Sequence, residues 1–119
     1  MNYTAEEKSF QFATRIVKVY KYMTESKKEF ILSKQLLRCG TSIGANISES
    51  QQGQSRADFI SKLSIALKEA CETNYWLRLL HATDYLSDAE FNSLIQDCQE
   101  LEKMLTAIIK SSKSQGAPS

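Results

Sequence analysis

A helical stretch that carries two interior glycines constrains the fold of this chain more than any other feature. The stretch spans residues 36–49, and the glycines are Gly40 and Gly44. Each interior glycine costs a helix roughly 1 kcal/mol relative to alanine, so a compensating contact is expected. At about 100° per residue, Gly40, Gly44 and Ser48 share one helical face that admits a close neighbour. We expect this face to pack against another helix of the same subunit, or else against a second subunit or a ligand.

Three capping boxes mark where further helices begin. In a capping box a Ser or Thr side chain accepts a backbone N–H three residues on, and an acidic side chain there returns the bond. The chain has three such pairs: Thr4 with Glu7, Ser55 with Asp58, and Ser87 with Glu90. Together with the apolar spacing, they predict helices over about 4–23 and 55–82 and a third from residue 87.

The start of the second helix has two candidates. Ser26 with Glu29 is another capping pair, but residues 24–28 also read as a polar break, and we favour Ser33 as the start. The helix should end near residue 52. Gly53 is then expected in the left-handed conformation that ends many helices, which predicts a tight antiparallel hairpin with the helix capped by Ser55.

Four such helices predict an all-α, antiparallel up-and-down four-helix bundle. From the 119 residues we expect one core and a single domain. We expect the bundle to occupy residues 1–110 and a flexible tail to occupy residues 111–119, which contain Gly116 and Pro118. The apolar stripe of the third helix is expected at Phe59, Leu63, Ala66, Leu67, Ala70, Leu77 and His81.

A second apolar face on the third helix predicts assembly. Ile65, Trp76 and Leu80 fall on a different side of this helix from its main stripe. One bundle interior cannot bury both faces, and Trp is enriched at protein interfaces. We therefore expect these three side chains in or near a contact between identical subunits.

Polar side chains on the second and third helices are expected to form a network across their hairpin, since charges near a core are costly unless paired. The predicted members are Arg38, Ser42, Asn46, Glu49, Glu69 and Glu72, with Arg78 nearby. No nucleophile, base and carboxylate pattern accompanies them, so we expect no catalytic residues and no enzyme. His81 lacks the Glu-x-x-His context of a di-iron bundle, and the three cysteines lack metal spacing, so neither a metal nor a cofactor is expected.

Basic residues gather in the first third of the chain, although the net charge is only +1. Between Arg15 and Arg38 the basic residues outnumber the acidic ones by five. The possible nucleic-acid patch consists of Arg15, Lys18, Lys21, Lys27, Lys28 and Lys34. Repeated around a ring, such a patch would attract RNA or an acidic protein surface.

A family resemblance rests on residues in and after the glycine-containing helix: Arg38, Ser42, Ile43, Asn46, Ile47, Glu49, Gly53, Ser55 and Phe59. They resemble the signature of small four-helix-bundle proteins encoded in intervening sequences of large-subunit ribosomal RNA genes, some described as ribosomal-protein-like. The resemblance covers roughly residues 8–110 and implies a bundle commonly assembled as a ring of five, with no established enzymatic activity. A similar fold serves as the accessory protein of diversity-generating retroelements, where a strongly basic ring associates with a reverse transcriptase and nucleic acid. The low net charge here departs from that group.

Residues and resemblance together predict a non-enzymatic, homo-oligomeric interaction or scaffold protein, and the resemblance implies a pentamer. The alternative is an RNA-associated accessory protein, linked to the ribosome or to a reverse transcriptase. The sequence has no apolar signal region and no run near the roughly 18 apolar residues of a membrane span. We therefore expect a cytoplasmic protein with neither a membrane nor a small molecule as its partner.

Overall fold

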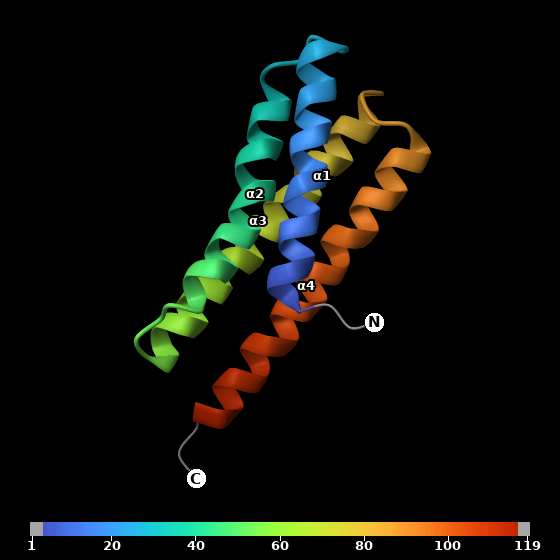
Figure 1. The fold of residues 1–119 in the computed structure, drawn as a ribbon. Helices are drawn as coiled ribbons and strands as arrows, with labels where there is room; N and C mark the ends of the chain where they lie inside the picture. The colour runs from blue at the N-terminus through green and yellow to red at the C-terminus, as the bar shows by residue number, and fades with distance from the viewer. Residues whose placement is uncertain (1–3, 117–119) are drawn as a thin grey trace.

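The computed structural model describes residues 4–116, which form four α-helices. These are α1 (Ala5–Glu25), α2 (Leu32–Ser50), α3 (Arg56–Ala82) and α4 (Asp88–Gly116). Successive helices run up and down beside one another, as Figure 1 shows. The predicted all-α four-helix bundle is confirmed. The bundle is elongated, about 55 Å by 25 Å by 22 Å.

The capping serines and threonine lie where the sequence predicts them. The Thr4 hydroxyl accepts the Glu7 N–H at 3.1 Å, and the Glu7 carboxylate accepts the Thr4 N–H at 3.3 Å. Ser87 and Glu90 form the same reciprocal pair at 3.0 and 3.1 Å. At the start of α3, the Ser55 hydroxyl accepts the Asp58 N–H at 3.1 Å. These local bonds satisfy backbone N–H groups that have no partner inside the helix.

Helix α2 begins at Leu32 because a glutamate caps it, and neither candidate serine does so. The Glu29 carboxylate accepts the backbone N–H groups of Ile31, Leu32 and Ser33 at 3.1, 2.8 and 2.7 Å. Ser33 donates its hydroxyl to the Glu29 carbonyl at 2.8 Å, and Ser26 ends α1. The predicted start of this helix at Ser33 is therefore one residue from the observed start at Leu32, but the prediction missed Glu29 as the capping residue.

The cap also fixes the charge state of Glu29. Burial works against the charged form, but the N–H groups of Ser33, Leu32 and Ile31 outweigh it and lower the pKa of the Glu29 carboxyl. The negative charge also suits the positive end of the α2 dipole. Glu29 thus ties the α1–α2 turn to the start of α2, and Lys28 in this turn lies in the left-handed region at φ 55°.

The expected left-handed Gly53 is not found, since none of the glycines in residues 4–116 has a positive φ. Gly53 serves close approach instead. A Cβ atom built on it would lie 3.1 Å from the Ser50 carbonyl oxygen and 3.3 Å from the Phe59 nitrogen. The turn between α2 and α3 is therefore tight, as predicted, for a different physical reason.

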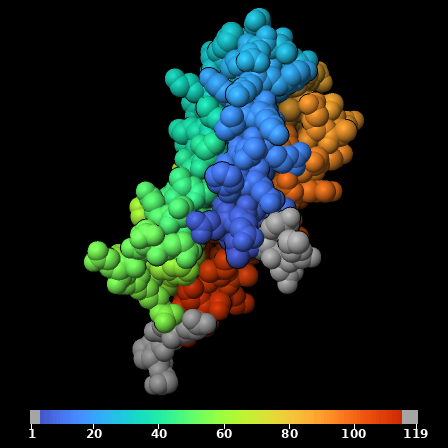
Figure 2. Space-filling view, viewed as in Figure 1, coloured from blue at the N-terminus to red at the C-terminus, as the bar shows by residue number. Residues whose placement is uncertain are grey.

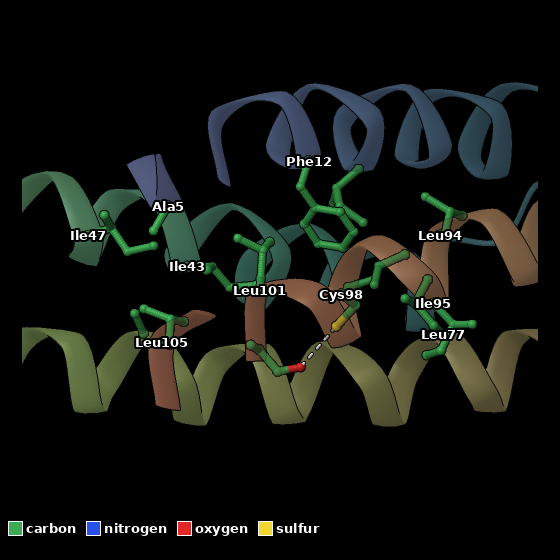
Figure 3. Close-up of a cluster of buried hydrophobic side chains, with 14 of the residues drawn as sticks. Ala5, Phe12, Ile43, Ile47, Leu77, Leu94, Ile95, Cys98, Leu101 and Leu105 are labelled. Atoms are coloured by element: carbon green, nitrogen blue, oxygen red, sulfur yellow. Dashed lines mark hydrogen bonds between the residues drawn. The ribbon is translucent and has the colours of Figure 1, made fainter. Parts of the chain in front are cut away.

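The core runs through the centre of the bundle and takes side chains from every helix. Figure 3 shows part of it, including Phe12 of α1, Ile43 of α2, Leu77 of α3 and Leu101 of α4. On α3 the buried stripe also contains Thr73 and Leu80, which the sequence placed elsewhere or omitted. Three residues expected in that stripe are half-buried at its edge: Phe59, Leu67 and His81.

Helix α4 extends beyond its expected end. It continues to Gly116, so residues 111–116 are helical and the boundary predicted after residue 110 falls inside α4. Ser112 is buried, and its carbonyl oxygen accepts a bond from Arg56 Nη1 at 3.2 Å. The rest of the predicted tail, residues 117–119, lies outside the described residues.

The glutamate cap generates a prediction about pH. Because its folded pKa is lowered, Glu29 stabilises the fold at pH values above the ordinary carboxyl value of 4.5, and this stabilisation is lost as pH falls through the folded pKa. Glu29→Gln should lower the free energy of unfolding by about 1 to 2 kcal/mol at pH 7, the usual value of a lost cap. Urea unfolding at several pH values measures the difference, which should shrink in acid. A difference that is constant from pH 7 to pH 3 would contradict a charged cap.

Candidate interaction surfaces

The predicted glycine face of α2 lies against α1. A Cβ atom on Gly40 would be 2.9 Å from both Cγ1 and Cγ2 of Ile16, a distance that real Cβ atoms do not tolerate. One turn later, a Cβ on Gly44 would lie 3.2 Å from the Ser9 hydroxyl oxygen. Gly40 is therefore needed for the approach of the two helices, and the Cβ built on Gly44 would also lie 3.5 Å from the Ser9 backbone carbon of α1.

A groove of about 310 Å³ follows this contact along the outer surface of α1 and α2. Its α1 side consists of Glu6, Ser9, Phe10 and Ala13. Its α2 side consists of Thr41, Gly44, Ala45 and Ser48. We call this the α1–α2 groove; the two helices that form it lie side by side in Figure 2. Ser48, predicted to pack beside the glycines, is exposed at its edge.

The groove offers little for catalysis. Its Ser9 hydroxyl donates to the Glu6 backbone carbonyl at 2.9 Å, so this serine faces no base that would activate it. The Glu6 side chain is exposed. Phe10, at the rim, is 74% exposed, which makes the surface apolar and open.

Part of the predicted polar network exists. Arg38 bridges to Glu69 at 3.5 Å and also pairs with Glu72, across the α2–α3 hairpin. Glu72 additionally accepts the indole N–H of Trp76 at 3.0 Å. Since half of the Arg38 side chain is exposed, each pair contributes at most about 1 kcal/mol.

The other predicted members do not join this network. Ser42 donates to the Arg38 carbonyl at 2.7 Å and Asn46 to the Ser42 carbonyl at 2.8 Å, both within α2. Glu49 pairs with Lys62 at 3.3 Å, nearer the turn between α2 and α3. Arg78 donates to Asn74 on its own helix at 2.9 Å.

The predicted subunit-contact residues of α3 do not form one surface. Leu80 is fully buried in the bundle, so its assignment to an outer face was wrong. Trp76 is half-buried and packs against the core, with the Tyr75 ring at 5.0 Å in an edge-to-face arrangement. Ile65 remains exposed, at 38%. The α3 register places Leu80 inward together with Leu77 and Thr73.

The basic segment is less uniform than its sequence suggests. Arg15 is paired with Asp97 of α4 at 2.6 Å and also donates to the Ser93 hydroxyl at 2.8 Å. The ammonium group of Lys27 lies 5.7 Å from the centre of the Tyr22 ring. Five lysines of this segment are exposed and form no ion pair within residues 4–116: Lys18, Lys21, Lys27, Lys28 and Lys34. Exposed lysines without an ion pair also occur on α3 and α4, at Lys68, Lys103, Lys110 and Lys113.

An ion-pair cluster between α1 and α4 was not predicted. Lys8 bridges to Asp97 at 3.1 Å and to Glu100 at 3.0 Å, and Arg15 completes the cluster. Burial acts against the charge of Asp97, but Arg15 and Lys8 outweigh it and lower the pKa of the Asp97 carboxyl. The residues are far apart in sequence, so helix periodicity alone gives no signal for their contact.

Two large apolar side chains at the α1–α2 turn were also missed. Phe30 is 57% exposed and Ile31 is 75% exposed. They follow Glu29 in the capped turn and have basic neighbours in Lys27 and Lys28. We call residues 26–31 the tip; it forms the top of the molecule in Figures 1 and 2. The sequence signal for this exposed pair was its position directly after three charged residues, 27–29.

Cys71 of α3 and Cys98 of α4 lie near the α3–α4 contact, and Cys39 is buried on α2. Cys98 is buried and donates to the Ala70 carbonyl at 3.3 Å, the bond drawn in Figure 3. Burial raises the pKa of the Cys98 thiol, and nearby Glu102 raises it further. Burial and Glu102 also raise the pKa of the exposed Cys71. Residues 4–116 contain no group of three His, Cys, Asp or Glu side chains that could hold a metal.

The contact between α1 and α2 predicts different effects for its two glycines. Gly40→Ala should destabilise the protein by about 1 to 3 kcal/mol, because Ile16 is β-branched and cannot move aside easily. Gly44→Ala, its matched control, gains up to about 1 kcal/mol of helix propensity against a milder contact and should be near neutral or stabilising. Urea midpoints measure both. Equal midpoints would show that the close approach at Gly40 is not a constraint.

No described helix has a stretch long and apolar enough to cross a bilayer. The family model described as 23S rRNA-intervening sequence protein matches residues 1–107. A crystal structure from the S23 ribosomal protein family of Bacteroides thetaiotaomicron, of unknown function, is 56% identical with a TM-score of 0.88. That match covers 89% of this chain and 95% of the other. No curated protein matches. With a matching model over most of its length and the same fold as a solved relative, the chain belongs to the 23S rRNA-intervening sequence protein family.

Proposed function

We propose that this chain is a non-enzymatic interaction protein that works as a homo-oligomer. The observation that carries the proposal is the set of large apolar side chains left on the outside of one bundle. Five of the seven lie on α1 or at the tip: Phe10, Val17, Tyr22, Phe30 and Ile31. Scattered exposed apolar residues are ordinary, but a concentration on one helix and its adjoining turn is typical of an interface.

This distribution moves the proposed subunit contact from α3 to α1 and the tip. Ile65 and Tyr75 are the exposed large apolar residues of α3, and Trp76 is engaged with the core and with Glu72. A head-to-tail contact joins one surface of a chain to a different surface of the next copy. Such contacts generate a ring when the rotation between neighbouring copies closes. A ring of five is what the family resemblance implies.

A second candidate function is association with RNA. It is favoured by five exposed lysines that lie close together in the sequence and form no ion pair within residues 4–116: Lys18, Lys21, Lys27, Lys28 and Lys34. They belong to α1, the tip and the start of α2. A ring would repeat them around its circumference, so that a molecule with a small net charge would still present a basic surface. Arg15 does not contribute, because Asp97 pairs with it.

Molar mass in solution tests the leading proposal. Light scattering during gel filtration at micromolar concentration should give a multiple of the 13.5 kDa chain mass, five for a pentamer. Burial of exposed apolar area drives the association, so the mass should hold in high salt. A mass of 13.5 kDa at every concentration up to 100 times the lowest would refute the homo-oligomer.

Salt dependence tests the RNA alternative. Affinity for structured RNA should fall steeply between low and moderate salt, since each neutralised phosphate releases a counterion. Reversing Lys18 and Lys21 to Glu should weaken binding at least tenfold, whereas Lys110→Glu, an exposed lysine near the end of α4, should have little effect. Filter binding measures both. If the two variants lost RNA affinity equally, or if the wild type bound no RNA at low salt, association with RNA would be refuted.

A further inference from the structure

We infer that the tip of one copy docks into the α1–α2 groove of the next copy, in a head-to-tail contact. This inference rests on the proposed homo-oligomer and names the two surfaces that would meet. Three observations support it: an apolar projection, an apolar groove on a different part of the same chain, and opposite charges around the two.

The tip is a projection held rigidly in place. Ile31 is 75% exposed although its backbone N–H is bound to the Glu29 carboxylate at 3.1 Å. Phe30 is 57% exposed beside it. The Glu29 backbone N–H also binds the Met23 carbonyl at 2.9 Å, which ties the turn to α1. A projection that is already ordered loses little entropy when it binds, so its apolar area is available for affinity.

The groove is a receptor of matching chemistry. Its volume is about 310 Å³. Small residues such as Gly44 and Ala45 line its α2 side, and Phe10 and Ala13 line the other. Large apolar side chains entering this space would displace water from Phe10, which is otherwise 74% exposed.

Charge complementarity selects the groove rather than another tip. Lys27 and Lys28 precede the apolar pair of the tip, Glu29 is turned inward as the cap, and the exposed Glu25 ends α1 just before the tip. Glu6 lines the groove, and Glu7 follows it in the exposed first turn of α1. Two tips would bring the lysines of both copies together, whereas a tip in the groove places its lysines near Glu6 and Glu7.

The tip cannot reach its own groove. Gly44 lies twelve residues after Leu32 on one helix, so the groove is about 18 Å along α2 from the tip, at 1.5 Å per residue. The contact must therefore join two copies displaced along their long axes. Such a contact joins different patches of the two partners, and it closes into a ring when the bundles tilt relative to the ring axis.

Cysteine cross-linking tests this arrangement. Ile31→Cys and Ala45→Cys are combined in a Cys71→Ser background, which removes the exposed native thiol. Mild oxidation of the folded double variant should give a ladder of covalent oligomers that ends at the ring size, because a disulfide requires the two Cβ atoms to lie about 4 Å apart. Each single variant is the matched control and should remain uncross-linked, since a head-to-tail contact never places a residue against itself.

A second variant measures the energetic role of the tip. Phe30→Ser with Ile31→Ser should raise the dissociation constant of the oligomer at least tenfold, with the helical circular dichroism unchanged. Tyr75→Ser, an aromatic residue of similar exposure on α3, should leave the constant as it is.

The outcomes separate the inference from the proposed function. A wild-type oligomer that gives no ladder, and whose mass survives the tip substitutions, would overturn the docking inference while the homo-oligomer stands. A wild-type mass of 13.5 kDa would overturn both. Loss of RNA binding in the tip variant with unchanged oligomer mass would also overturn the inference, because it would assign the tip to another class of partner.

Discussion

The close approach of α1 and α2 at Gly40 is the constraint on which the rest of the structure depends. Ile16 occupies the space that any other residue at position 40 would fill, and Ile16 itself is fully buried. This contact sets the separation of the first two helices and therefore the position of Phe12 in the core. Gly44, one turn further along α2, lines the groove that follows this contact on the outer surface of the two helices.

Local signals predicted the fold well because capping is a local interaction. Thr4, Ser55 and Ser87 bind N–H groups three residues away, and a sequence contains all that is needed to see this. The start of α2 was less clear because Glu29 caps through its carboxylate from outside the helix. Leu80 was misplaced because a regular stripe drawn along the 27 residues of α3 does not include the neighbours that decide which side is inward.

The candidate surfaces were less predictable, for a related reason. Arg38, Glu69 and Glu72 could be anticipated, because long charged side chains reach across a hairpin. Ser42 and Asn46 could not, since short polar side chains in a helix readily bond to a carbonyl four residues back. The tip was overlooked because Phe30 and Ile31 lie in a turn at the end of the bundle. Helix periodicity does not predict whether side chains in a turn are exposed.

The uneven packing of the outer helices gives the bundle an order of opening. α2 and α3 each have two close neighbours, whereas α1 and α4 meet much less extensively and are joined there by the cluster of Lys8, Arg15, Asp97 and Glu100. Partly exposed ion pairs weaken with salt, while apolar contacts do not. Amide hydrogens along this boundary should therefore exchange before those of the α2–α3 hairpin, and the bundle should part there first under stress.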